Sequence, residues 1–226
     1  MDTRIGVVTF PGTLGEGDVA RAVRTVGAEA VAVTAAETDL SGLEALILPD
    51  GRSYGDKPTP GLRAAAAPVG AAIVAAAGQG LSVLGIGNGF HILCALGLLP
   101  GEFSANASGR SVCVDQWVRI ERGDTAWTSR FDTGAEVLIP LRTAAGRYHV
   151  DAATEERLTG AGRVVARYAG DDPTGSTGAI AGVSSADGRV VGMTVAPEYA
   201  IGPLTGPSDD GLGVFYSMLD TAAAAG

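Results

Sequence analysis

Three glycines, each separated from the next by one residue, mark the place in this chain where chemistry is most to be expected. They form the pattern Gly85-Ile-Gly-Asn-Gly89, which follows the apolar run Ser82–Ile86 and precedes a helix-like segment. A buried strand that turns sharply into a helix through such a pattern is typical of a nucleophile elbow. An elbow projects its central side chain over the helix N-terminus, where backbone N–H groups favour negative charge. The central position here is Gly87, so nothing projects.

Two other interpretations of these glycines stay open. A dinucleotide-binding fingerprint needs the spacing Gly-x-Gly-x-x-Gly after the first strand of a βαβ unit, and both the spacing and the place in the chain differ here. An ordinary strand-to-helix turn that happens to use glycine fits the same residues. The residues of the turn alone do not separate that turn from an elbow.

Apolar periodicity indicates the elements that must position this turn. In the first half, short β-branched runs alternate with helix-like segments, which predicts a parallel sheet covered by helices. The expected strands are Ile5–Thr9, Ala30–Val33, Ala45–Pro49 and Ser82–Ile86, and the expected helices are Asp18–Val26, Pro60–Ala77 and Phe90–Leu98.

From about Ser111 onward, strands are expected at short intervals with Gly and Asp turns between them, which predicts an antiparallel extension of the sheet. They are Cys113–Ile120, Val137–Leu141, Val164–Tyr168, Ala179–Val183 and Val190–Val195. A last helix is expected to begin near Ser208–Asp210, whose short oxygen side chains suit an N-cap. We therefore expect one α/β domain over residues 1–226, with a central, mostly parallel sheet flanked by helices.

Composition narrows the classes of partner and site. With Lys+Arg 16 and Asp+Glu 25 among 226 residues, the formal net charge is −9, which disfavours nucleic acid. The apolar stretch Ala64–Ala77 is interrupted by Pro68 and is too short for a membrane span. The opening Met-Asp-Thr-Arg lacks the pattern of an export signal, and Cys94 and Cys113 lack metal-type spacing. We expect a cytoplasmic protein with reduced thiols, no metal and no membrane role.

Five segments, the glycine turn among them, give the chain an end-to-end resemblance to the glutaminase subunit of phosphoribosylformylglycinamidine synthase. This subunit is a class I glutamine amidotransferase. The segments are Val7-Val-Thr-Phe-Pro-Gly12, Leu48-Pro-Asp-Gly-Arg-Ser-Tyr-Gly-Asp56, Leu84-Gly-Ile-Gly-Asn-Gly-Phe90, Ile92-Leu-Cys-Ala-Leu-Gly-Leu-Leu-Pro-Gly101 and Ser208-Asp-Asp-Gly-Leu-Gly213. The resemblance implies the class I glutamine amidotransferase-like (flavodoxin-like) fold.

In that family the elbow reads Gly-Ile-Cys-Asn-Gly and a late strand ends in His-Pro-Glu, and the Cys, His and Glu release ammonia from glutamine. The resemblance places the nucleophile on Gly87 and the imidazole on Ala196, and it leaves only Glu198 in place. A thiolate must attack the glutamine amide, and an imidazole must generate that thiolate and protonate the leaving ammonia. Glycine and alanine can do neither, so we expect no glutaminase activity.

A third departure lies in the loop after the third expected strand. The family's Pro-Gly-Gly, which supplies oxyanion-hole amides, reads Pro49-Asp50-Gly51 here. A carboxylate on Asp50 would oppose the negative charge of a tetrahedral intermediate. The other polar residues expected around the old pocket are Arg52, Asn88 and His91.

Several residues outside the triad positions have side chains that could be functional. We expect Cys94 and Cys113 to pack in the interior rather than to act as substitute nucleophiles. Neither His91 nor His149 falls at the imidazole position. Asp56 could contact a partner or only shape a turn. Lys57–Ala64 departs from the family, so contacts there are not carried over.

In the family the subunit docks on a larger ATP-dependent synthetase that makes the amidine from formylglycinamide ribonucleotide, helped by a small bridging subunit. The resemblance therefore implies a non-catalytic partner of such a synthetase, in purine or modified-nucleoside biosynthesis, with no cofactor of its own. One alternative is a repurposed enzyme using Asp50, Arg52, His91 and Glu198. Another is a sensor that binds glutamine or a nucleotide without turnover.

Overall fold

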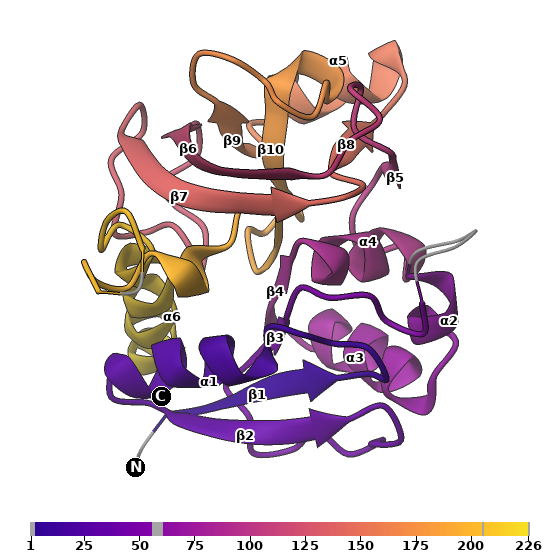
Figure 1. Ribbon diagram of the computed structural model, residues 1–226. Helices are drawn as coiled ribbons and strands as arrows, with labels where there is room; N and C mark the ends of the chain where they lie inside the picture. The colour runs from indigo at the N-terminus through magenta and orange to yellow at the C-terminus, as the bar shows by residue number, and fades with distance from the viewer. Residues whose placement is uncertain (1–2, 56–60, 205, 226) are drawn as a thin grey trace.

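The computed structural model describes residues 3–55, 61–204 and 206–225, and within them nine strands form one twisted sheet (Figure 1). The strand order is β2-β1-β3-β4-β11-β10-β9-β6-β7. The strands are β1 (Arg4–Thr9), β2 (Glu29–Thr34), β3 (Ala45–Leu48), β4 (Ser82–Ile86), β6 (Val112–Ile120), β7 (Glu136–Thr143), β9 (Val164–Tyr168), β10 (Ile180–Ser184) and β11 (Val190–Met193). Two further strands, β5 (Glu102–Ser104) and β8 (Arg147–His149), pair separately.

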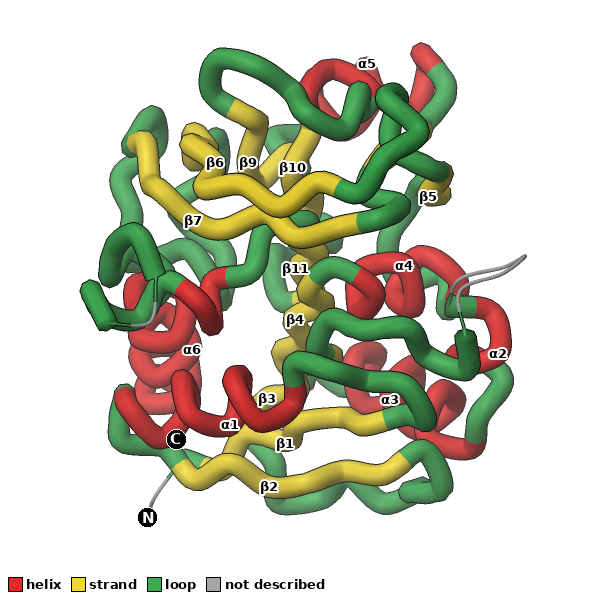
Figure 2. Tube along the Cα trace, viewed as in Figure 1, coloured by secondary structure: helices red, strands yellow, loops and turns green. Residues whose placement is uncertain are grey.

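The sheet has a parallel part and an antiparallel part, as the sequence predicts. Strands β2, β1, β3, β4 and β11 pair in parallel, whereas β10, β9, β6 and β7 continue the sheet with antiparallel pairing. Figure 2 shows this continuous series of strands from β2 to β7. The register sets Ile86 beside Met193, so the chain leaves β4 and β11 at the same edge of the sheet.

Helices cover both faces of the parallel part (Figure 1). They are α1 (Glu16–Thr25), α2 (Leu62–Ala65), α3 (Pro68–Gly78), α4 (Asn88–Ala95), α5 (Ala152–Gly160) and α6 (Leu212–Ala225), with 3₁₀ turns η1 (Thr177–Ala179) and η2 (Pro197–Tyr199). One core contains Val19 of α1 and Phe215 of α6, and the other contains Ile73 of α3 and Phe90 of α4. The fully buried strands β3 and β4 lie between the two cores, which fixes the start of α4.

The expected single helix over Pro60–Ala77 is wrong. Pro60 lies outside the described residues, and the remainder forms α2 and α3 with a break at Ala67, whose φ and ψ of −71° and 156° are extended. A proline disfavours helical geometry in the residue before it and suits the first position of a new helix. Pro68 therefore ends one helix and begins the next.

Two other expectations need correction. Cys113 is exposed rather than packed, because the first half of β6 extends past β9 and pairs only with β7. The last helix begins at Leu212 rather than near Ser208–Asp210. The oxygens of Ser208 and Asp210 instead bond Leu138 of β7, since Ser208 Oγ donates to its carbonyl and Asp210 Oδ2 accepts from its N–H, each at 2.7 Å.

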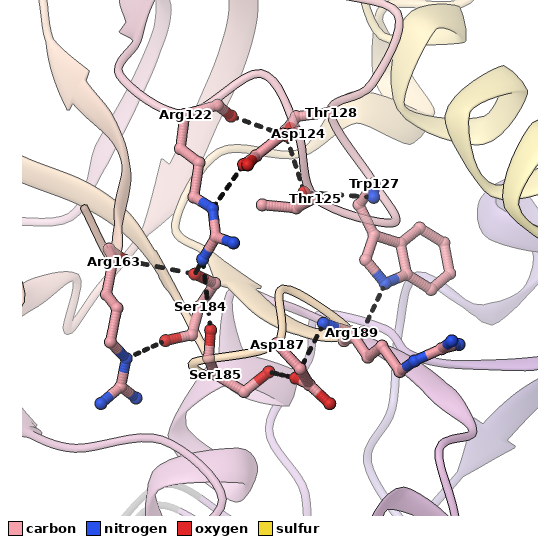
Figure 3. Close-up of polar contacts among 10 residues, drawn as sticks. All are labelled: Arg122, Asp124, Thr125, Trp127, Thr128, Arg163, Ser184, Ser185, Asp187 and Arg189. Carbon is pink, nitrogen blue, oxygen red and sulfur yellow. Dashed lines mark hydrogen bonds and ion pairs between the residues drawn. The ribbon is translucent and has the colours of Figure 1, made fainter. Parts of the chain in front are cut away.

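The hairpin between β10 and β11 is fixed by a polar network (Figure 3). The Arg122 guanidinium donates to Ser184 Oγ at 3.0 Å, and Arg163 donates to the Ser184 carbonyl at 2.9 Å. Trp127, which is fully buried, donates its indole N–H to the Arg189 carbonyl at 3.2 Å. The contacts of Arg122 and Trp127 hold the turn between β10 and β11 against the loop that follows β6, and Arg163, just before β9, holds the end of β10.

Within the described residues, no helix is both long and apolar enough to cross a membrane.

Candidate functional site

Gly87 forms the turn between β4 and α4, where the sequence places the elbow. Its φ and ψ are 51° and −112°, a conformation that side chains rarely adopt, and it is the N-cap of α4. Its N–H donates to the Met193 carbonyl at 2.8 Å, which ties the turn to the end of β11. The backbone thus has the sharp, strained form of an elbow, but the position that would carry a nucleophile has no side chain.

The carboxylate of Asp50 fills the space next to Gly87. Asp50 Oδ1 accepts a hydrogen bond from the Asn88 N–H at 2.8 Å. A Cβ atom placed on the Gly87 backbone would lie 2.4 Å from this oxygen and 2.6 Å from Asp50 Cγ. The amide of the residue after the nucleophile is an oxyanion donor in an elbow. Here a carboxylate of the chain itself already bonds that amide.

The loops after β1 and β3 hold Asp50 in this place. The Asp50 carbonyl accepts from the N–H groups of Leu14 and Gly15 at 3.1 and 3.2 Å. The next residue, Gly51, has φ of 152°, and a Cβ there would lie 2.7 Å from both Gly12 O and Leu14 N. Only glycine fits such a close approach of two backbones. The carboxylate is therefore positioned by a tightly joined pair of loops.

Arg52 and Asn88 continue from this junction in different ways. The N–H of Arg52 donates to the Gly12 carbonyl at 2.7 Å, and its side chain is exposed. Asn88 is buried, and its Oδ1 accepts from the Ser53 N–H at 3.2 Å. Asn88 thus joins the start of α4 to the loop after β3.

Ala196 and Glu198 follow β11 and lie at the same edge of the sheet as Gly87. Ala196 is buried and donates its N–H to the Pro140 carbonyl at 2.8 Å. Glu198, in η2, is 0% exposed, and neither of its carboxylate oxygens has a hydrogen-bond partner among the residues that the structure describes. A Cβ atom on Gly15 would lie 3.5 Å from both Glu198 Oε1 and Asp50 N. Gly15 is therefore close to both the Glu198 carboxyl and the backbone of Asp50.

The environment of Glu198 disfavours its charged form. Burial is the largest cause that raises the pKa of this carboxyl to about 8, and the charges of Asp50 and Asp18 act in the same direction. Arg142 opposes them and lowers the pKa. A triad carboxylate normally has an imidazole as its partner. Ala196 carries only a methyl group, so it cannot be such a partner.

His91 does not join Glu198. Its ring stacks on Phe103 with centroids 3.9 Å apart and an interplanar angle of 19°, beside the aromatic cluster of Phe90 and Tyr148. Burial lowers the pKa of His91 to about 3, so the imidazole stays neutral near pH 7. His149, the other histidine, bonds Ser104 Oγ through Nε2 at 2.6 Å.

Neither cysteine belongs to the turn at Gly87. Cys94 is half-buried on α4, and its thiol donates to the Pro100 carbonyl at 3.5 Å. Burial raises the pKa of Cys94 to about 12, which leaves the thiol protonated and suits the expected packing role. Within the described ranges, no group of three or more His, Cys, Asp or Glu residues could hold a metal. Asp56 and residues 57–60 lie outside those ranges.

Sequence reasoning did not identify three residues near Glu198. The Arg142 guanidinium lies over the Tyr199 ring, with Cζ 4.7 Å from its centroid. Burial and, next, a hydrogen bond with Asp18 raise the pKa of Tyr199 to about 12. Tyr199 directly follows Glu198 in η2, whereas Arg142 and Asp18 come from β7 and α1, so no spacing in the sequence could have brought those two to Glu198.

Comparison with known proteins places this geometry in a family. The profile of the CobB/CobQ-like glutamine amidotransferase domain matches residues 2–209. Phosphoribosylformylglycinamidine synthase subunit PurQ of Nocardia farcinica is 54% identical over 225 residues, covering 100% of both chains. The subunit PurQ of Mycobacterium tuberculosis strain H37Rv is 53% identical over 220 residues, covering 97% of this chain and 98% of that one.

Comparison with solved structures supports the same family. The structure of PurLQS from Thermotoga maritima superposes with a TM-score of 0.89 at 36% identity, covering 98% of this chain and 99% of that one. A glutamine amidotransferase from the same organism, at 12% identity and a TM-score of 0.64, shows the fold alone. The α/β fold expected from the sequence is confirmed as that of class I glutamine amidotransferases. The chain belongs to the PurQ family of phosphoribosylformylglycinamidine synthase glutaminase subunits, within the class I glutamine amidotransferases.

Proposed function

We propose that this chain is a member of the PurQ family that cannot hydrolyse glutamine. In this proposal, Gly87 stands where the nucleophilic cysteine would be and Ala196 where the histidine would be. Only the carboxylate, Glu198, is kept. Hydrolysis needs a thiolate to attack the amide carbon and a proton donor for the departing ammonia. Neither residue supplies either group.

The observation that carries the proposal is the position of the Asp50 carboxylate. It bonds the Asn88 N–H and lies within 2.4 Å of any Cβ that could be added at Gly87. An oxyanion of a tetrahedral intermediate would need that amide and would be repelled by the carboxylate. Asp50 thus opposes catalysis in two ways, by occupying space and by its charge.

We further propose that the chain acts as the partner of a larger ATP-dependent, amidine-forming synthetase, with a small bridging subunit, in purine or modified-nucleoside biosynthesis. Support comes from the full-length match to PurQ subunits and to a structure of PurLQS. Ser208 and Asp210 contribute less support than their family resemblance suggests, because their side chains bond Leu138 within this chain.

The alternative of a repurposed enzyme needs polar groups that converge on the old pocket. Glu198 and the backbone of Asp50 are both close to Gly15, but His91 packs against Phe103 and the side chain of Arg52 is exposed. This arrangement favours the partner role. A glutamine or nucleotide sensor is distinguished by calorimetry, where saturable heat with glutamine and no ammonia release would favour it.

Ammonia release from glutamine tests the loss of glutaminase. The purified chain, alone and with the synthetase of its own source, is expected to give no signal above a buffer blank. The matched control is the Cys94→Ser/Cys113→Ser variant. Turnover in the wild type that survives both substitutions would mean that another nucleophile acts and would overturn the proposal.

Partner binding is tested separately. The chain is expected to co-purify with the synthetase from lysate of its own source. A monomer in lysate that contains the synthetase would contradict the partner role while leaving the loss of glutaminase standing.

A further inference from the structure

A hollow of about 740 Å³ lies at the edge of the sheet where β4 begins. Its lining comes from the loop before β3, the end of α3, the start of β4, the start of β11 and the second half of α6. Ser82 begins β4 and Gly87 follows its end, so the two residues lie roughly 16 Å apart along the strand. The hollow is therefore separate from the triad positions.

One wall of the hollow is apolar. It includes Leu81 from the start of β4 and Met218 and Ala222 from α6, and Ala76 of α3 also lines the hollow. Met218 is 1% exposed, whereas the other three are half-buried, so part of their apolar surface remains open. Ligand sites of this size combine such apolar walls with a few polar groups. The wall suits the apolar body of a small organic molecule.

The guanidinium of Arg189 also lines the hollow. Its Nη1 donates to the Gly80 carbonyl at 3.1 Å, and its side chain makes no other hydrogen bond and no ion pair with a described residue. The Asp187 carboxylate accepts from the Arg189 backbone N–H at 3.2 Å and attracts the guanidinium without forming an ion pair with it. Figure 3 shows the guanidinium directed away from this carboxylate. Because a guanidinium has five N–H donors, most of them remain for a ligand.

Two carboxylates line the hollow as well, and both already accept backbone hydrogen bonds. Asp39 Oδ1 accepts from the Ser41 N–H at 2.9 Å, and Glu44 Oε2 accepts from the Arg4 N–H at 2.7 Å. The Arg4 guanidinium, beside the same loop, pairs with Glu29 at 3.3 Å. Both lining carboxylates are exposed, so solvent and salt screen their charges. The half-buried guanidinium is therefore the charge that a ligand meets inside the hollow.

Ser82 adds a hydroxyl beside this guanidinium. The parallel register sets Val83 beside Val190, so Ser82 and Arg189 are neighbours whose side chains point to the same face of the sheet. Ser82 is 2% exposed, it lines the hollow, and its hydroxyl makes no hydrogen bond with a described residue. Buried polar groups without a partner are uncommon. The guanidinium and the hydroxyl together offer adjacent donors to an anionic group.

We propose that this hollow binds a small organic anion, namely a molecule with one carboxylate, phosphate or sulfonate group on an apolar body. The anionic group accepts hydrogen bonds from Arg189 and Ser82, and the apolar body packs on Leu81 and Met218. The site goes beyond the proposed function and does not rely on it. Its tests measure neither ammonia release nor co-purification, so their failure would leave the loss of glutaminase and the partner role untouched.

Two fluorescent probes that differ only in the anionic group test the site. 8-Anilinonaphthalene-1-sulfonate carries a sulfonate, and N-phenyl-1-naphthylamine has the same rings without it. Titration of the folded chain at pH 7.5 is expected to give one saturable site for the sulfonate probe, with a Kd of about 10–100 µM for a ligand of this size. The neutral probe should bind about tenfold more weakly. No saturable binding, or equal affinity for the two probes, would overturn the proposal.

Substitutions of Arg189 test the role of its charge. Arg189→Met keeps an unbranched side chain without charge and should raise the Kd of the sulfonate probe about tenfold, while the Kd of the neutral probe stays within about twofold. Arg189→Lys keeps the charge and should stay within about threefold of the wild type for both probes. Because Arg189 also bonds the Gly80 carbonyl, circular dichroism confirms that each variant is folded. An unchanged Kd of the sulfonate probe in Arg189→Met, or an equal loss for both probes, would overturn the assignment.

A bulky side chain locates the site independently of charge. Ala222→Trp places an indole in the hollow from α6 and should raise the Kd of the sulfonate probe at least about tenfold, because it occupies the space of the ligand. The matched control is Ala223→Trp, the same substitution at the next residue, which is exposed and does not line the hollow. Its Kd should stay within about twofold of the wild type. Equal binding by the two variants would place the probe elsewhere and overturn the proposal.

Discussion

At its beginning, β11 leaves a hairpin where Arg122 and Arg163 both donate to Ser184 and Trp127 donates to the Arg189 carbonyl (Figure 3). At its other end, four residues lead from the strand to Glu198, whose two oxygens have no partner among the described residues. The two ends belong to one strand of four residues. They differ in whether buried polar groups have partners, because Ser184 is hydrogen-bonded and the Glu198 carboxyl is not.

The difference shows that the two ends of β11 are held by different groups. The network at the hairpin holds the beginning of β11 without a contact from Gly87 or Ala196, so this part of the strand does not depend on a side chain at either position. Buried polar groups that keep their partners contribute to stability, whereas those that lose one become a cost. The catalytic end can therefore change while the hairpin end stays fixed.

Introducing the family's Cys and His at positions 87 and 196 is the strongest test of the site that follows β4 and β11, called the catalytic end below. It shows whether this site lacks only those side chains. Gly87→Cys alone should be inert, because its thiol has no imidazole and faces Asp50. The triple variant Gly87→Cys/Ala196→His/Asp50→Gly should hydrolyse glutamine about 10⁴-fold faster than the single variant, since it regains a general base and an oxyanion site. Ammonia release measures the rates.

The control for this restoration is Ala196→His/Asp50→Gly without the cysteine, which should remain at the blank. A triple variant that folds, hydrolyses no glutamine and resists labelling by a glutamine-like electrophile would show that the pocket has been rebuilt. The repurposed-enzyme interpretation would then replace ours.

Removing Trp127 should produce the largest loss of stability at the hairpin end. Trp127 is fully buried and satisfies the Arg189 carbonyl, so Trp127→Ala both opens a cavity and leaves an acceptor unpaired. We expect a loss of about 3–5 kcal/mol in the free energy of unfolding, measured by urea denaturation with circular dichroism. Trp117, 50% exposed on β6, is the control, and Trp117→Ala should cost under about 1 kcal/mol. Similar losses for both would mean that the hairpin network does not stabilise the fold.

At the catalytic end, replacing Glu198 by Gln should stabilise the folded protein. The folded pKa of Glu198 is raised to about 8 from an ordinary value of 4.5. Between these values the folded state binds more protons than the unfolded chain, so this contribution is complete below about pH 4.5 and is lost as the pH rises through 8. The free energy of unfolding of Glu198→Gln should therefore exceed that of the wild type by about 2–4 kcal/mol at pH 8.5, with little difference at pH 4.5.

Urea unfolding at pH 4.5, 6.5 and 8.5 measures this difference. The exposed Glu156→Gln should track the wild type at every pH. If the gap between Glu198→Gln and the wild type does not widen with pH, Glu198 is not an unpaired buried acid.

The sequence predicted the strands and the turn that position the site better than the contacts between its side chains. Strands β3 and β4 and the glycine turn could be predicted because local apolar runs and turn residues determine them. The three-residue strands β5 and β8 carry no periodicity and depend on each other, so they could not be recognised. Helix α5 was also not predicted, although Asp151 caps it by accepting from the Thr154 N–H. That capping was a readable signal.

Long-range contacts explain what remained hidden at the site itself. The charge of Asp50 near the oxyanion position was expected from resemblance, but its overlap with the Gly87 Cβ position depends on two loops joined through Gly12 and Gly51. The stacking of His91 on Phe103 likewise depends on the unrecognised β5. The sequence therefore identified Gly87 and Asp50 but could not show that a side chain at position 87 would overlap the Asp50 carboxylate.

The smallest expected effect comes from the overlap between a side chain at position 87 and the Asp50 carboxylate. Gly87→Ala should destabilise for two reasons, namely backbone strain at a φ of 51° and the overlap of its Cβ with Asp50 Oδ1. In an Asp50→Gly background only the strain remains. The double-mutant cycle should therefore give a coupling free energy of about 1–2 kcal/mol, measured by urea unfolding of the wild type, both single variants and the double variant.

The control is Gly97, just after α4, which has a φ of 73° and no heavy atom within 4 Å of its Cβ position, so Gly97→Ala adds strain without overlap. Its cycle with Asp50→Gly should give no coupling within error. Additive effects at Gly87 as well would mean that Asp50 moves aside freely, and the catalytic end would then be open rather than blocked.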